Sequence, residues 1–133
     1  APESRQDGNR IVIAGRAVEV YVFAADPANL PHWAAGLAKG EATPDGEAVV
    51  VDSPMGRVRV TFAPRNPFGV LDHDVVLPSG ESVYNPLRVL NHPEGAELLF
   101  NVRQRDLSDD EFERDIAAVA ADLGRLRELL ENR

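Results

Sequence analysis

The stretch SDDEFERDIAAVAADLGRLRELLENR, residues 108–133, decides the fold class because it predicts one long amphipathic helix. Its first four residues form a capping-box pattern, in which the Ser108 hydroxyl accepts from a first-turn amide and Glu111 reaches back. The acidic residues of this start also suit the positive end of a helix. Apolar residues then recur at alternating steps of four and three, which places them on one face: Phe112, Ile116, Val119, Leu123, Leu126 and Leu130.

The segment before this helix, residues 41–103, alternates between apolar and polar residues as half-buried antiparallel strands do. Within residues 57–62, for example, Val58, Val60 and Phe62 share one face. Turn signals rich in proline and glycine separate the runs, at residues 44–46, 54–56, 64–69, 78–80 and 93–95. Such short connections predict a meander of hairpins, and hence a curved antiparallel sheet of six to seven strands.

The N-terminal part of the chain is less regular. Residues 10–14 predict a first strand that Gly15 ends, and we expect residues 1–9 to be a disordered or cloning-derived N-terminus. The segment AVEVYVFAA, residues 17–25, fits helical and strand spacing alike.

Two prolines limit any helix in the next segment, DPANLPHW at residues 26–33, to a turn or two. Residues 34–37 are expected to extend that short helix. The whole of residues 10–133 is expected to form a single domain, because a chain of this length suits one core.

The composition is that of an ordinary globular protein. The formal net charge of -8 argues against the basic surface that phosphate backbones require. No apolar run approaches the roughly 20 residues that span a bilayer. The absence of cysteine excludes disulfides, thiolate metal sites and a cysteine nucleophile, and suits a reducing cytoplasm. We therefore expect a cytoplasmic monomer or weak homodimer without a nucleic-acid partner or membrane insertion.

The predicted arrangement implies a cavity, because one helix cannot fill all the space that a curled sheet encloses. The chain has only one tryptophan, two tyrosines and five phenylalanines to close that space. Gaps of this kind are usually apolar pockets, although smaller side chains could also pack the space shut. The residues expected to line the pocket are Trp33, Val58, Val60, Phe62, Leu71, His73, Val75, Asn85, Leu87, Phe100, Phe112 and Ile116.

His73 is the main candidate for chemistry. It alternates with apolar residues in the predicted strand 70–77, so it shares their inward face. A three-residue loop at 78–80, with Gly80 in the left-handed conformation, would place Asn85 opposite His73. A two-residue loop would instead pair Asp74 with Asn85. An inward His73 could fix the polar end of a ligand, act as a weak catalytic candidate in proton transfer, or form a structural hydrogen bond with Asn85.

Trp33 is expected either to cap the pocket entrance or to anchor its loop on the sheet edge. Tyr84 and Arg88 alternate onto the outer face with Asp72, where we expect surface packing and an ordinary surface ion pair that is worth little. The carboxylates between residues 108 and 115 are expected to be solvated at the helix start.

Metal and cofactor sites find no support in the sequence. The histidines are scattered, at positions 32, 73 and 92, without the spacing of a metal site. No glycine-rich phosphate loop or nucleophile elbow occurs either. We expect neither a metal nor a cofactor.

Several weak motifs, taken together in order, resemble the START-like or SRPBCC superfamily, in its polyketide cyclase/dehydrase and lipid transport branch. The motifs are VYVF at 20–23, DPANLPHW at 26–33, GL at 36–37, FGVLDH at 68–73, YNPLRV at 84–89, ELLF at 97–100, SDDEF at 108–112 and DL at 122–123. The resemblance covers residues 11–131. It implies an α+β helix-grip fold, with a curved sheet around the C-terminal helix and two short helices near the pocket mouth. It also implies that residues 17–25 are helical.

The resemblance does not imply an activity, because members of this superfamily range from cyclases to plain carriers. The leading hypothesis is binding or carriage of a small hydrophobic molecule, lipid-like or aromatic, without catalysis. One alternative is a polyketide-type cyclase or dehydratase in which His73 moves a proton. Another is an interaction module with a filled core.

Overall fold

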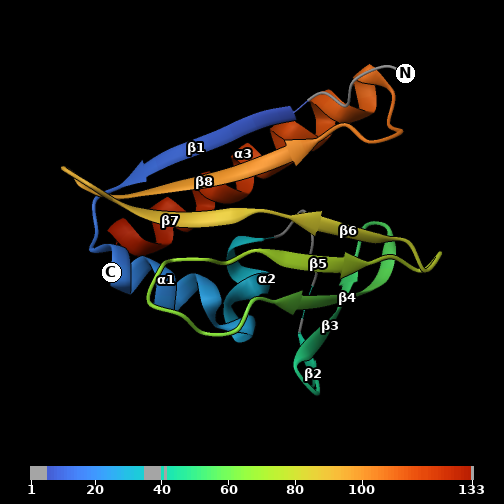
Figure 1. The fold of residues 1–133 in the computed structure, drawn as a ribbon, viewed down its shortest axis with the longest axis horizontal. Coiled ribbons are helices and arrows are strands. Elements are labelled where there is room, and N and C mark those ends of the chain that lie inside the picture. Colours follow the sequence, from blue (N-terminus) through green and yellow to red (C-terminus); the bar gives the residue numbers. More distant parts are fainter. Residues whose placement is uncertain (1–5, 35–39, 41, 133) are drawn as a thin grey trace.

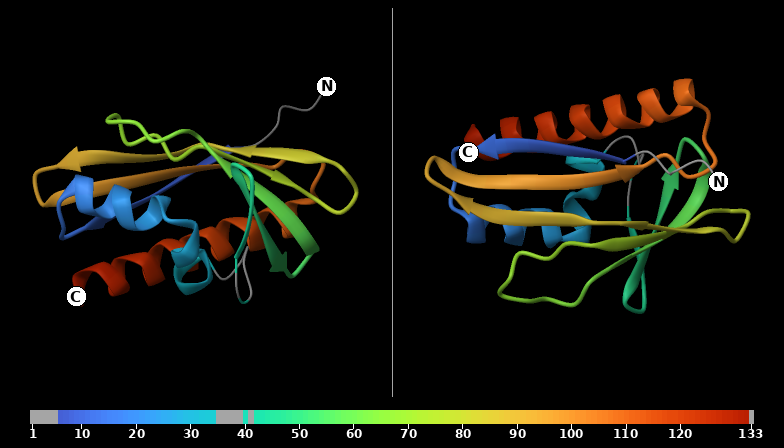
Figure 2. Two further views of the ribbon diagram at one scale, coloured as in Figure 1. Left: turned by 90° about the horizontal axis from the view of Figure 1, so that it is seen from below. Right: turned by 45° about the horizontal axis from the view of Figure 1, so that its top comes forward.

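The computed structural model describes residues 6–34, 40 and 42–132. In these residues the helices and strands follow in the order β1 (Gln6–Ile13), α1 (Ala17–Ala25), the 3-10 turn η1 (Pro27–Asn29), α2 (Leu30–Trp33), β2 (Thr43–Asp45), β3 (Ala48–Ser53), β4 (Gly56–Phe62), β5 (His73–Val76), β6 (Ser82–Asn85), β7 (Leu87–His92), β8 (Gly95–Arg103) and α3 (Asp109–Glu131). The strands are antiparallel, and α3 runs beside them (Figure 1). Figure 2 shows the three α-helices on one side of the strands. The predicted α+β helix-grip fold is confirmed.

The strands form two antiparallel sheets, of order β2-β3-β4-β5-β6 and β1-β8-β7. The described strands number eight, against the six to seven expected. The two sheets meet where β6 continues into β7 through Pro86, a residue that has no amide donor for a ladder. The Leu71 amide donates to Leu87 O at 2.8 Å and thus holds the segment before β5 against β7.

The β5–β6 hairpin has the register that the three-residue loop predicted. The Leu77 amide donates to Glu81 O at 2.8 Å, and Gly80 takes the left-handed conformation with φ 91°. His73 therefore lies opposite Asn85, as expected. The short turn sets this register because its geometry fixes which residues of the two strands face each other.

The capping box at the start of α3 is also confirmed. The Ser108 hydroxyl accepts from the Glu111 amide at 3.1 Å, and a Glu111 carboxylate oxygen accepts from the Ser108 amide at 2.9 Å. Phe112, Leu123 and Leu126 are buried along the predicted apolar face. Of the described helices, none has the length and apolar character needed to cross a membrane.

Strand β1 begins at Gln6, four residues before the expected start. Residues 6–9 therefore belong to the sheet rather than to a disordered terminus, because β8 extends as far as Arg103 and offers them a partner. Helix α1 buries Val20, Tyr21 and Ala24, which settles the ambiguous segment as helical.

Helix α2 is four residues long, within the limit that the prolines set, and it ends at Trp33. Residues 34–37 were expected to extend this helix, but Ala34 is its C-cap and is not helical. Residues 35–37 lie outside the described residues. The GL motif at 36–37 lies there too.

Asp72 corrects the expectation of an ordinary surface ion pair. Its side chain is only 5% exposed, although that of Arg88 is 46% exposed. The two carboxylate oxygens accept from Arg88 Nε at 2.9 Å and Nη2 at 2.8 Å, from the Leu87 amide at 2.9 Å and from the Tyr84 hydroxyl. The sequence did not reveal this burial because β7 covers Asp72 only after the chain has crossed between the sheets at Pro86.

Candidate functional site

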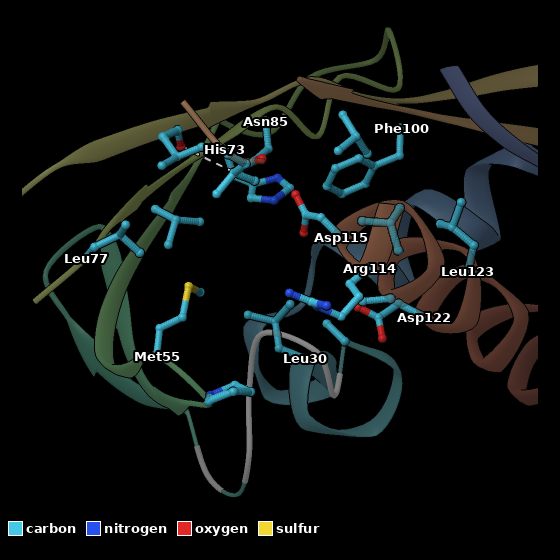
Figure 3. Close-up of a pocket in the computed structure, with 18 of the residues that line it drawn as sticks. Leu30, Met55, His73, Leu77, Asn85, Phe100, Arg114, Asp115, Asp122 and Leu123 are labelled. Carbon is cyan, nitrogen blue, oxygen red and sulfur yellow. Dashed lines mark hydrogen bonds between the residues drawn. The ribbon is translucent and has the colours of Figure 1, made fainter. Parts of the chain in front are cut away.

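A cavity of about 550 Å³ lies between the five-stranded sheet, β8, α2 and α3. Figure 3 shows side chains from these elements around it. The sheet and the turns contribute Pro54, Met55, Phe62, His73, Val75, Leu77, Val83, Asn85, Phe100, Val102, Arg105 and Leu107. The helices and the residue that caps α2 contribute Leu30, Trp33, Ala34, Glu111, Arg114, Asp115, Ala118, Val119, Asp122 and Leu123. The wall is therefore mainly apolar, with a few polar groups.

His73 places an imidazole in this apolar wall. The residue is 5% exposed, and its Nδ1 lies 3.0 Å from Leu71 O. A carbonyl oxygen can only accept, so Nδ1 carries the hydrogen and a neutral ring leaves a lone pair on Nε2. Nε2 has no hydrogen-bond partner among the described residues. The ring is packed by Phe62 at 4.9 Å and by Phe100 at 5.8 Å between centroids.

Burial lowers the pKa of His73 because the charged imidazolium would lose its hydration. The Leu71 carbonyl and the carboxylates of Asp72 and Asp74 oppose this effect and raise the pKa, but more weakly. The net direction favours the neutral ring. His73 therefore presents a hydrogen-bond acceptor to the cavity at neutral pH.

Asn85 lies opposite His73 but does not bond to it. Its Nδ2 donates to Val83 O at 3.2 Å, whereas the imidazole uses Leu71 O. The structural His73–Asn85 hydrogen bond considered from the sequence is therefore absent between these two described residues. Each side chain uses one polar atom in a hydrogen bond to the backbone two residues before it, and its other polar atom stays available.

Helix α3 adds a row of polar residues that the sequence analysis did not place at the cavity. Glu111 lines the cavity. Figure 3 shows Arg114, Asp115 and Asp122 there too. The expectation of fully solvated carboxylates between residues 108 and 115 is wrong for Asp115. Burial raises the pKa of its carboxyl, and the charge of Arg105 opposes this effect.

A signal for this row exists in the sequence. Glu111, Asp115, Ala118 and Asp122 recur at steps of four, three and four, one position beside the apolar face. A helix face at that spacing borders the core and can enter a cavity.

Trp33 lies in the cavity wall and is 3% exposed. Its indole nitrogen is buried and has no hydrogen-bond partner among the described residues. Its carbonyl oxygen accepts from Arg125 Nε at 3.4 Å, which ties α2 to α3.

The structure brings half of the expected lining residues to the cavity: Trp33, Phe62, His73, Val75, Asn85 and Phe100. The others lie elsewhere. Val58, Val60, Leu71 and Leu87 pack inside the main core cluster, Phe112 is buried outside that cluster, and Ile116 is half-buried. The alternation of a strand identifies its inward face, but it does not distinguish inward residues under other side chains from those at a cavity.

Within the part of the chain that the structure describes, no group of three or more His, Asp or Glu side chains could hold a metal ion. The three histidines lie on different elements: His32 on α2, His73 on β5 and His92 on β7.

No family model matches the chain, and no curated protein matches it. Solved structures do. DynU16, from the dynemicin biosynthetic locus, has a TM-score of 0.74 at 18% identity, over 98% of this chain and 48% of that one. The chain thus spans about half the length of DynU16.

Two further structures match over most of both chains. The Aha1 dimer from Colwellia psychrerythraea has a TM-score of 0.76 at 13% identity, over 96% of each chain. An AHSA1-like protein from Rhizobium etli has a TM-score of 0.67 at 21% identity, over 99% of this chain and 85% of that one. Identities this low establish the fold alone, and this chain therefore shares the helix-grip fold of these proteins.

Proposed function

We propose that this chain binds a small, mostly apolar molecule in the cavity between the sheet and α3. The observation that carries the proposal is the cavity itself, of about 550 Å³ with mainly apolar walls. Ligand pockets commonly measure roughly 300–1,000 Å³ and combine apolar walls with a few polar groups. Binding or carriage of a ligand in such a pocket requires no catalytic group.

A direct test is to place a large side chain in the cavity by a substitution on α3. Both Ala117 and Ala118 are exposed on α3, but only Ala118 lines the cavity. Ala118→Trp should therefore weaken binding of the neutral probe N-phenyl-1-naphthylamine by about tenfold or more, because the indole occupies the space of the probe. Ala117→Trp, the matched control, should bind it like the wild type.

Probe fluorescence gives the affinities, and thermal unfolding checks that both variants are folded. Equal binding by Ala118→Trp and the wild type, or no binding by the wild type, would contradict the proposal. Native mass spectrometry of the purified wild-type chain then serves to identify any molecule that copurifies.

A proton-transfer enzyme is the second candidate function, and one observation favours it. His73 and Asp115 line the same cavity, and burial moves the pKa of the imidazole down and that of the carboxyl up. Titratable groups whose pKa values are perturbed by burial within one cavity are often found at functional sites. A cyclase or dehydratase reaction that uses this pair should slow by about 10²-fold or more in His73→Ala. If the protein is only a carrier, His73→Ala should at most weaken its affinity for the ligand.

We further propose membership of the START-like superfamily, which the sequence resemblance and the shared fold support. DynU16 belongs to a biosynthetic locus, which supports a role with small molecules. The Colwellia Aha1 protein is a dimer, which supports testing for a weak homodimer here by light scattering over a concentration series.

A further inference from the structure

The polar atoms that His73 and Asn85 leave available are both hydrogen-bond acceptors. Leu71 O fixes the hydrogen of the imidazole on Nδ1, so the neutral ring offers only the lone pair of Nε2. Val83 O fixes the amide nitrogen of Asn85, so Oδ1 is the atom left over. Neither Nε2 nor Oδ1 has a partner among the described residues.

Helix α3 adds another hydrogen-bond acceptor. Asp115 on α3 lines the cavity, and its carboxyl has no hydrogen-bond partner in the described part of the chain. Figure 3 shows His73, Asn85 and Asp115 at the same side of the cavity, away from Met55 and Leu77. This side therefore presents acceptors from both the sheet and the helix.

We propose that the ligand is a mainly apolar compound that carries a hydroxyl or N–H donor, and that this donor binds Nε2 of His73. The inference rests on the proposed function and narrows its ligand class. A ketone or an ether oxygen placed against Nε2 would leave both that oxygen and Nε2 without a hydrogen bond. A plain hydrocarbon would leave Nε2 desolvated without a partner.

Two probes of nearly the same shape test this selectivity. 2-Naphthol carries a donor, and 2-methoxynaphthalene has the same rings and oxygen without one. By isothermal titration calorimetry, the wild-type chain should bind 2-naphthol about fivefold more tightly than the ether, the ratio that one hydrogen bond supports. In His73→Phe, which keeps an aromatic ring between Phe62 and Phe100, the ratio should fall to about one.

The outcomes separate the two proposals. If neither probe binds the wild type, both the proposed function and this inference are overturned. If both bind the wild type equally, or if His73→Phe keeps the preference for the naphthol, the cavity binds ligands but the donor assignment is wrong.

A measurement on the wild-type chain keeps the inference testable even if His73→Phe does not fold. Nitrogen-15 NMR of the His73 ring should show the hydrogen on Nδ1, and adding 2-naphthol should shift the Nε2 resonance. A hydrogen on Nε2 in the free protein would overturn the assignment.

Discussion

Replacing Asp72 by asparagine should destabilise the fold at the line where the two sheets meet. The carboxylate accepts from both Arg88 nitrogens, the Leu87 amide and the Tyr84 hydroxyl, and its side chain is 5% exposed. An asparagine of the same shape turns one acceptor into an amide donor that faces other donors. Breaking a buried ion pair costs about 3–5 kcal/mol.

Arg88 lies half in solvent, so water can rehydrate it in the variant. The loss in the free energy of unfolding should therefore lie near the lower end of this range, at about 3 kcal/mol. Urea unfolding measures it as a lower midpoint with an unchanged slope. Asp74→Asn is the matched control, because Asp74 lies two residues further along the chain, in β5, but is exposed; its effect should stay within about 0.5 kcal/mol. If Asp72→Asn proves as stable as this control, the network does not hold the sheets together.

The same site has a pH signature. The Arg88 hydrogen bonds, followed in effect by those of Tyr84 and Leu87, hold the pKa of Asp72 far below its ordinary value of 3.8, although burial opposes them. Between the two pKa values the unfolded chain binds more protons, so the stabilisation is full above roughly pH 5 and declines as the pH falls. The stability difference between wild type and Asp72→Asn should therefore shrink below that pH.

Other perturbations have equally specific outcomes. Gly69→Ala should lower the free energy of unfolding in urea by about 3 kcal/mol or more, because φ is 74° and a Cβ would lie 2.1 Å from Val89 O. Gly80→Ala is the control, because φ is 91° but no atom lies near its Cβ; it should lower the free energy of unfolding by only about 1–2 kcal/mol. Ser108→Ala should cost about 1 kcal/mol by the same assay, since it removes the cap of α3. Asp115→Leu should raise the thermal midpoint and weaken 2-naphthol binding, because it relieves the desolvated carboxyl and fills the cavity.

Local signals predicted the parts of the fold that local geometry determines. The turn at residues 78–80 was enough to place Asn85 opposite His73, because hairpin register follows from loop length. The capping box located the start of α3 for the same kind of reason. Residues 17–25, in contrast, fit both periods, and only the resemblance indicated a helix there.

Features that depend on distant contacts were not predictable in this way. Asp72 reads as an outward residue of its strand, and its burial depends on β7, which approaches through the break at Pro86. Val58 and Phe62 share one face of β4, yet only Phe62 reaches the cavity. Strand alternation specifies a face, whereas a position at a cavity depends on which other elements cover that face.

The cavity stays unfilled partly because α3 lines it with polar and small side chains. Asp115 and Ala118 occupy cavity positions where leucines would fill the space, and a leucine at position 115 would also avoid the cost of desolvating a carboxyl group. The capping box and the buried apolar face already hold α3 in place, and no hydrogen bond of the Asp115 side chain to another described residue contributes to it. Local choices that lower stability without serving the fold are expected at functional sites. Asp115 and Ala118 therefore argue for a ligand site independently of His73.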